Sequence, residues 1–236
     1  MPSARAARTP APRKPIAPVA PARPKPPRSL ELATLDEDDF QDEGAYNAIG
    51  FYDLALSGRS AKAPEFHQCR FNRVDLSGTA LNKAAFTDCL IENSNLANLH
   101  AEDSTLTRVT IDGVRMTGLH WIDGMLRDVT VRGSRLDLSV FRATELRHVR
   151  FEECNLSRAD FATANLGGAH FVRCDLTAAQ FSGASMVGTR FTECTLAGIG
   201  GVTSFDGATI TTGDLLELSY ALATALGITV EPTTSG

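Results

Sequence analysis

From Phe51 to Leu196 every fifth residue of this chain is apolar, and the column has thirty members without an exception. Since only 43% of the whole chain is hydrophobic, chance does not produce such a column. The period matches neither an α-helix, which repeats about every 3.6 residues, nor a β-strand, which repeats about every two. The sequence therefore indicates a five-residue structural unit that turns one large apolar side chain inward.

A second column, two residues before each large one, is made of small residues. From Cys69 to Cys194 it has 26 members, of which 24 are Ala, Cys, Ser, Thr, Val or Gly. Residue types also recur at 20 residues, as in Phe141, Phe161 and Phe181. Four units are therefore expected to form one coil with a filled interior. Thirty units would make about 7.5 coils, stacked at roughly 4.8 Å.

Several stretches resemble the consensus of the pentapeptide-repeat family, Ala-(Asp/Asn)-Leu-x-x. The best local matches are Ala159-Asp160-Phe161, Ala164-Asn165-Leu166, Cys154-Asn155-Leu156, Cys174-Asp175-Leu176 and Val74-Asp75-Leu76. The resemblance covers about 146 residues. It implies an all-β solenoid, a right-handed quadrilateral β-helix, and we assign this domain to residues 46–200.

The residues before the repeats divide into a basic arm and an acidic segment. Residues 1–30 hold nine of the eleven prolines and seven Arg or Lys, while residues 31–65 hold nine acids and two bases. Prolines recur every third residue from Pro12 to Pro27, so in a polyproline II helix they would line one face. We expect residues 1–45 to be a disordered arm followed by a solvated acidic linker. The alternatives are docking of the arm in a proline-reading groove or on an anionic surface such as nucleic acid, and a weak attraction between arm and linker.

Residues 201–236 are expected to form a C-terminal cap, because the five-residue period ends at Gly200 and Gly201. Thr212 is the predicted N-cap of a helix over about 213–226, and Gly227 is the predicted stop. Its apolar face would consist of Leu215, Leu216, Leu218, Leu222 and Leu226. We expect this helix to cover the open end of the solenoid, which otherwise exposes unpaired backbone groups. A homodimer formed by two such helices is the alternative.

No catalytic, cofactor-binding or metal site is predicted. The chain has no Gly-x-Ser-x-Gly motif, no P-loop and no Gly-rich dinucleotide motif. His100 and His120 would stack in adjacent coils beside Glu102, which permits a weak surface metal site, although a solvated pair needs no ligand. All the cysteines lie in the small inward column and have no Cys-x-x-Cys spacing; they are Cys69, Cys89, Cys154, Cys174 and Cys194. Their odd number, and the lack of a signal or membrane segment, favour the cytoplasm.

One patch departs from the two columns. Leu99 and Leu119 stand at small positions, Ala101 stands at a large one, and Trp121 lies one coil above Ala101. The exchange is explained if the indole fills the volume that Ala101 leaves. A bulge that presents apolar surface to a partner is the alternative.

The resemblance implies two kinds of function. Some members of the family mimic duplex DNA and bind DNA gyrase or related topoisomerases, which they protect or inhibit. Such mimicry needs an anionic surface, whereas residues 66–200 carry 15 acids interleaved with 14 bases. We therefore expect a non-enzymatic interaction or scaffold protein with an unidentified protein partner. A gyrase modulator or protector is the alternative; no membrane contact is expected, and nucleic acid would be bound only weakly, through the arm.

Overall fold

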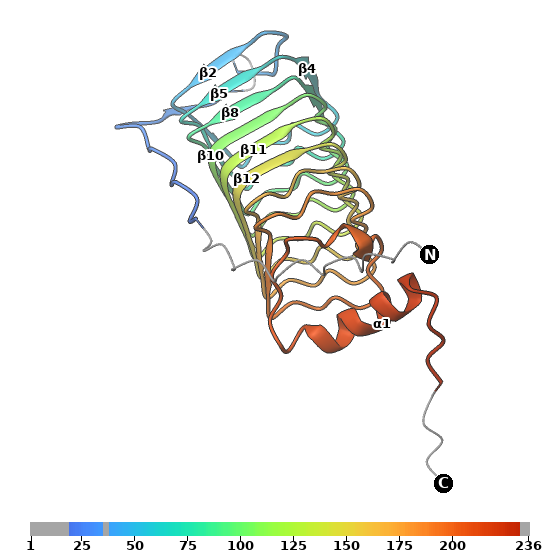
Figure 1. Ribbon diagram of the computed structural model, residues 1–236. Coiled ribbons are helices and arrows are strands. Elements are labelled where there is room, and N and C mark those ends of the chain that lie inside the picture. Colours follow the sequence, from blue (N-terminus) through green and yellow to red (C-terminus); the bar gives the residue numbers. More distant parts are fainter. Residues whose placement is uncertain (1–18, 35–37, 232–236) are drawn as a thin grey trace, which may run out of the picture.

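The computed structural model describes residues 19–34 and 38–231, and it shows a β-solenoid of about eight coils with one helix across its end (Figure 1). Within the repeats each strand residue pairs in parallel with the residue 20 positions later, as Phe51 does with Phe71 and Val129 with Val149. Four five-residue units therefore make one coil, which confirms the predicted quadrilateral solenoid. The strands are β1 Glu31–Leu32, β2 Ala45–Asn47, β3 Ile49–Tyr52, β4 Ser60–Lys62, β5 Glu65–His67, β6 Arg70–Asn72, β7 Ala80–Asn82, β8 Ala85–Thr87, β9 Leu90–Glu92, β10 Thr105–Asp112, β11 Met125–Arg132, β12 Glu145–Glu152, β13 His170–Val172 and β14 Arg190–Thr192.

The coils have four walls. Wall A contains β2, β5 and β8, and wall B contains β3, β6, β9, β13 and β14. The longer strands β10, β11 and β12 run through both walls and join them in one sheet. Wall C consists of single bridges that begin with Ala55 and Asp75. Wall D starts with β4 and β7 and continues as bridges through His100 and His120.

Each corner is turned by a residue with left-handed backbone. From Ala48 to Gly198 every fifth residue has a φ between 49° and 81°. Most of these residues are not glycine, and the local strain is offset because the corner N–H donates to the next coil, as Asp88 does to the Thr107 carbonyl at 3.0 Å. The corner conformation therefore belongs to the repeat itself, since it occurs at glycine and non-glycine positions alike.

The core is a continuous shaft of apolar side chains. All thirty residues of the large column are buried, each with 6% exposure or less. Phe141, Phe161 and Phe181 form one stacked ladder, with ring centroids 5.2 and 5.3 Å apart. Burial of each large side chain contributes roughly 1.5 to 3 kcal/mol, and neighbouring coils share this gain. The five cysteines are free thiols buried beside the large column.

The irregular patch lies inside the shaft. Leu99, Ala101, Leu119 and Trp121 are all buried, so packing compensation describes them and no apolar bulge forms. The indole leaves a small apolar cavity of about 30 Å³, and its Nε1 has no hydrogen-bond partner among the described atoms. Gly124 lies against the ring, because a Cβ there would be 2.4 Å from Nε1.

Residues 38–45 cover the N-terminal end of the shaft, in contrast to the solvated linker that their acidity predicted. The Phe40 ring is buried, with its centroid 5.4 Å from that of Phe66. Asp39 pairs with Arg59 at 2.9 Å, and Asp42 accepts the Lys62 N–H at 2.7 Å. The acids therefore tie this segment to the first coils, while residues 35–37 lie outside the described residues.

The C-terminal end is covered by the short 3-10 helix Val202–Ser204 and by helix α1, Leu215–Ala225. The N-cap of α1 is Asp214, which corrects the prediction of Thr212. The helix closes the last coil through polar contacts, since Asp214 Oδ1 accepts the Cys194 N–H at 3.0 Å and Glu217 Oε2 accepts the Leu196 N–H at 2.6 Å. Within residues 19–34 and 38–231, no helix has the length and hydropathy needed to cross a membrane.

Candidate functional site

Candidate binding positions lie on the outer surface, because side chains fill the interior of the solenoid. Four features stand out there: a segment bound along one corner, a cluster of arginines around one glutamate, a histidine pair, and the outer face of α1. The described residues contain no group of three or more His, Cys, Asp or Glu arranged to hold a metal ion.

Residues 19–34, here called the strap, lie along the corner between walls A and B (Figure 1). Pro21, Pro24, Pro27 and Leu30 are half-buried at every third position, and the residues between them are exposed. This is the one-faced pattern expected of a polyproline II helix lying on a surface. The described part of the predicted arm, residues 19–30, is therefore bound to the rod, and residues 1–18 lie outside the described residues.

Side chains of the corner hold the strap by its backbone. The Lys25 N–H donates to Asp88 Oδ1 at 3.0 Å, and the Lys25 carbonyl accepts from Gln68 Nε2 at 3.0 Å. Three residues earlier, the Ala22 N–H donates to Asp128 Oδ1 at 3.1 Å. Backbone contacts of this kind recognise the conformation of a segment more than its side chains.

The carboxylates under the strap are paired with basic groups. Arg108 donates to both oxygens of Asp88 at 2.7 Å, and the Asp88 side chain is only 4% exposed. This guanidinium lowers the pKa of Asp88. His148 Nδ1 lies 3.3 Å from Asp128. Asp88 is therefore ionised at neutral pH and suited to accept N–H groups.

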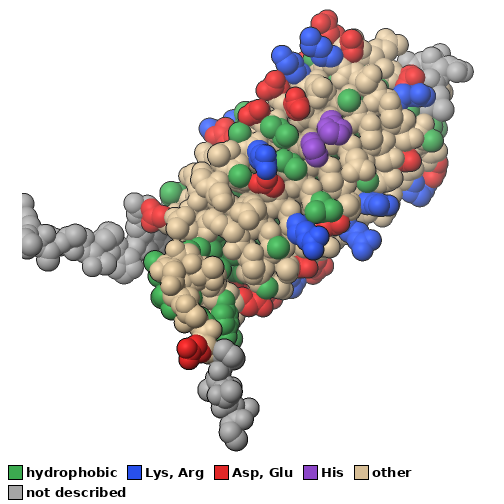
Figure 2. Space-filling view, turned by 90° about the vertical axis from the view of Figure 1, so that its right-hand side faces the viewer, with side chains coloured by type: hydrophobic (Ala, Val, Ile, Leu, Met, Phe, Trp, Pro, Cys, Tyr) green, Lys and Arg blue, Asp and Glu red, His purple; other side chains and the backbone are tan. Residues whose placement is uncertain are grey.

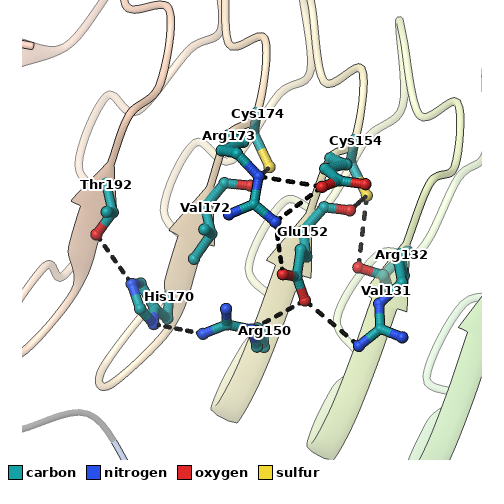
Figure 3. Close-up of polar contacts among 11 residues, drawn as sticks. Val131, Arg132, Arg150, Glu152, Cys154, His170, Val172, Arg173, Cys174 and Thr192 are labelled. Atoms are coloured by element: carbon teal, nitrogen blue, oxygen red, sulfur yellow. Dashed lines mark hydrogen bonds and ion pairs between the residues drawn. The ribbon is translucent and has the colours of Figure 1, made fainter.

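Farther along wall B, Glu152 is surrounded by arginines (Figure 3). Arg132, Arg150 and Arg173 approach its oxygens at 3.4, 3.3 and 2.8 Å. Arg150 has the largest part in lowering the Glu152 pKa. A carboxylate with a lowered pKa is a poor proton acceptor, so this cluster is better suited to hold coils together than to acid–base chemistry.

His170 extends this network and is neutral. Arg150 Nη1 lies 3.1 Å from His170 Nδ1, and a guanidinium can only donate, so Nδ1 is the acceptor and Nε2 carries the proton, 3.0 Å from the Thr192 hydroxyl (Figure 3). Burial, with the charges of Arg150 and Arg190, lowers the His170 pKa to about 4. The ring therefore contributes hydrogen bonds and no charge at neutral pH.

On wall D the structure brings His100 and His120 together, with ring centroids 4.5 Å apart and planes tilted by 56°. Imidazole side chains lie together on this face, with acidic and basic side chains not far from them (Figure 2). Burial and the neighbouring His100 lower the His120 pKa. The prediction that the chain has no catalytic, cofactor or metal site stays a prediction.

Arginines elsewhere on the coils pair with carboxylates of neighbouring coils. Three such pairs are Arg73–Asp53 at 2.6 Å, Arg70–Glu92 at 2.7 Å and Arg142–Asp160 at 2.6 Å. Because positive and negative groups alternate along the rod, each neutralises the field of the other. The paired acids therefore do not add up to one anionic surface.

Helix α1 turns most of its apolar side chains outward. Leu218 is buried, whereas Leu216 and Leu226 are 71% and 75% exposed and Tyr220 is also exposed. Hydrophobic side chains gather at this end of the molecule (Figure 2). The sequence had predicted the leucines but placed them against the last coil.

The parallel coils, the five-residue units and the filled shaft define this protein as a β-solenoid repeat protein. The family described as pentapeptide repeat region matches residues 64–141 and 136–200, which is more than half of the chain. The chain therefore belongs to the pentapeptide-repeat family. Comparison with curated protein sequences finds no significant match.

Among solved structures the chain is similar to HetL, a pentapeptide repeat protein involved in heterocyst differentiation regulation from the cyanobacterium Nostoc sp. strain PCC 7120, with 18% identity over 73% of this chain and 91% of HetL at a TM-score of 0.30. A trypsin-treated form of QnrB1, a plasmid-mediated fluoroquinolone resistance protein, is 17% identical over 80% of this chain and 100% of its own, with a TM-score of 0.31. Rfr23 from the cyanobacterium Cyanothece 51142 is 12% identical over 66% of this chain and 91% of its own, with a TM-score of 0.22.

Proposed function

We propose that this protein is a non-enzymatic interaction protein that works as a homodimer joined through α1 and holds a protein partner on its outer surface. The exposed apolar face of α1 carries the proposal. On a rod whose walls are largely polar, Leu215, Leu216, Tyr220 and Leu226 expose large apolar side chains together at one end. Adjacent apolar groups of this size on a water-soluble surface are typical of an interface.

A second copy of the chain fits this face. An interface with two-fold symmetry uses the same patch on both subunits, and an apolar helix face is complementary to itself when two copies pack side by side. The two rods would then extend away from the joint. A dimer of this kind presents its walls twice, which raises the avidity for a partner that has two binding positions.

The test is the oligomeric state of the full chain, measured by sedimentation equilibrium. Wild type is expected to be a dimer at micromolar concentration, and Leu216→Glu is expected to be a monomer, because a charge would be buried in the interface. Leu138→Glu is the matched control, since Leu138 is a 51% exposed leucine on the coils, far from α1 in sequence. A wild type that is still monomeric at about 100 μM would have a dimer Kd too weak for this interface. A dimer that survives Leu216→Glu would also exclude the interface.

We further propose that the protein works in the cytoplasm. The five free thiols support this, because a reducing compartment keeps stacked cysteines from oxidising. Cys154 and Cys174 are close enough that their side chains interact across adjacent coils. An oxidising compartment would put such pairs at risk of forming disulfides.

Modulation or protection of DNA gyrase is the alternative function. The alternation of arginines and carboxylates along the coils argues against it, since a DNA mimic needs uncompensated negative charge. A supercoiling assay with and without a quinolone decides the question. No effect at micromolar protein would remove the alternative, and protection of supercoiling would replace the scaffold proposal.

Weak nucleic-acid binding through the arm is a separate proposal, which Arg23, Lys25 and Arg28 support because they are exposed on the strap. Retention on immobilised duplex DNA that declines steeply with salt is the expected signature. Deletion of residues 1–30 should abolish the retention, because it removes all seven basic residues of the arm. Retention that is unchanged would show that the arm is not the binding element.

A further inference from the structure

The corner between walls A and B carries a column of polar side chains, one from each successive coil. This corner column consists of Gln68, Asp88, Arg108, Asp128 and His148. From Asp88 to His148 acids and bases alternate along it. Each acid contacts the base of the next coil, Asp88 with Arg108 and Asp128 with His148. The alternation places the two carboxylates two coils apart, which is about 9.6 Å along the rod.

That spacing matches one turn of a polyproline II helix. The strap donates the N–H groups of Ala22 and Lys25 to these carboxylates, and the two residues are three positions apart. Three residues of polyproline II advance about 9.3 Å, within a few tenths of an ångström of two coils. This helix has no internal hydrogen bonds, so its N–H groups are free to pair with an outside acceptor.

The prolines of the strap recur at the same three-residue spacing as the bonded N–H groups. Each bonded residue directly follows a half-buried proline, Ala22 after Pro21 and Lys25 after Pro24. Pro21 lies over a small hollow formed with Val149, Arg150 and His170. The corner therefore receives a proline every third residue and an N–H from the residue after it.

The part of the strap on the corner column, residues 19–30, is not needed to complete the core. The end of the strap is anchored separately, because β1 pairs with β3 and Ala33 packs against the core. The thirty large apolar residues are buried among the coils themselves, and strap side chains reach half-burial at most. Near the corner column, the strap is held by contacts to its backbone at Ala22 and Lys25. Departure of residues 19–30 would therefore leave the β1–β3 pairing and the solenoid in place and the corner column open.

We propose that the corner column is a docking groove for a proline-rich basic peptide of a partner protein, and that the strap is the intramolecular ligand which this peptide must displace. The peptide would carry a proline at every third residue and a non-proline residue after each. Basic residues suit it because the bonded residue lies against Asp88, as Lys25 does in the strap. The strap is present at an effective concentration on the order of millimolar, so a partner succeeds only if it binds more tightly or if the strap is released first.

Proline substitutions in the full chain test the groove, because proline removes an N–H while it favours the polyproline II conformation. The released variant is Ala22→Pro with Lys25→Pro. Arg23→Pro is the matched control, since it also exchanges a basic residue for proline but touches an N–H outside the contacts to the corner column. Unfolding temperatures that agree with wild type would show that each variant keeps its solenoid.

The first readout is trypsin cleavage after Arg28, which requires the strap to leave the rod. Loss of the two hydrogen bonds to Asp88 and Asp128 should speed this cleavage by about tenfold in the released variant. Arg23→Pro should behave as wild type. Equal cleavage of the released variant and the control would overturn the proposal.

The second readout is the binding of a fluorescent peptide with the sequence of residues 19–30, followed by anisotropy. The released variant should bind it at least about tenfold more tightly than wild type, whose groove is already occupied. Addition of Asp128→Ala to the released variant should weaken binding about tenfold, whereas addition of His148→Ala should not. A peptide that carries both proline substitutions should not bind.

Three results would show the proposal to be wrong. The first is a released variant that does not bind the peptide. The second is equal binding of the peptide with and without its two N–H groups. The third is conversion of a wild-type dimer to a monomer by the released variant, which would show that the groove takes the strap of a second copy.

Discussion

The cap at the C-terminal end gives a sharp prediction about how the rod is terminated. At some positions of the interior coils an N–H of the small column donates to a hydroxyl one coil later, as Val114 does to Ser134 Oγ at 3.0 Å. At the last coil Asp214 stands 20 residues after Cys194 and accepts its N–H at 3.0 Å. Glu217 likewise takes the place of the next coil's carbonyl for the Leu196 N–H. The two carboxylates therefore imitate a further coil.

Asp214→Ala is expected to leave a buried N–H without an acceptor. Such a loss costs about 1 to 3 kcal/mol, which corresponds to a fall of about tenfold to a hundredfold in the protection of the Cys194 amide against hydrogen exchange. Asp214→Asn should cost about 1 kcal/mol or less, because its side-chain oxygen still accepts the bond. Glu217→Ala should affect the Leu196 amide in the same way but more weakly, since Glu217 is partly exposed.

Amide hydrogen exchange of the full chain is the assay, with Phe151 as an internal reference in an interior coil. Coils of a solenoid depend mainly on their neighbours, so the Phe151 amide should keep its protection in Asp214→Ala. Unchanged protection of Cys194 would refute the role of Asp214. An equal loss at Cys194 and Phe151 would refute the local nature of the effect.

Two further predictions follow from the interior and from wall B. Gly124→Ala should destabilise the protein by about 1 to 3 kcal/mol in thermal unfolding, because the new Cβ would lie 2.4 Å from Trp121 Nε1 and 2.6 Å from the Ser104 carbonyl; an unchanged unfolding temperature would contradict the close packing. His170 should titrate near pH 4 by NMR instead of near 6.5. Since its folded pKa is lowered, stability should be full above about pH 6.5 and decline toward pH 4, as the unfolded state alone takes up the proton; His170→Gln should remove that part of the decline, and an identical pH profile would exclude it.

The repeat was predictable from sequence because the inward side chains recur at a fixed spacing along the chain. Phe161 and Leu166 reveal a period of five without knowledge of any distant contact, and the recurrence of Phe161 at Phe181 gives the coil length. Glycine, as at Gly78, is the residue type that favours a left-handed corner, but Arg73 and Asp88 adopt the same conformation with no signal in their residue type. There the geometry of the coil overrides local preference.

The strap and the caps were not predictable in the same way. Proline and charge favour an open chain by composition, whereas the bound strap depends on a match between its rise and the distance from Asp88 to Asp128, which exists only after folding. The burial of Phe40 was not predicted because the residue lies in an acidic run. An aromatic residue within that run, close to the first coil, was the one indication of a buried contact. The leucines of α1 were recognised, but their outward direction depends on Asp214 and Glu217 fixing the helix to the last coil.

The uniform 20-residue register constrains how such a gene can change length. Removal of 20 residues would rejoin the chain in phase, with every later side chain on its original wall and the rod one coil shorter. Removal of five would turn all later residues by a quarter of a circuit, so that the aromatic ladder of Phe161 and Phe181 would continue onto an adjoining side. Loss of the coil between Asp88 and Asp128 would keep the solenoid intact. It would shorten the distance between these two carboxylates, which would then no longer match the rise of the strap from Ala22 to Lys25. Rod length and strap recognition can thus diverge independently during evolution.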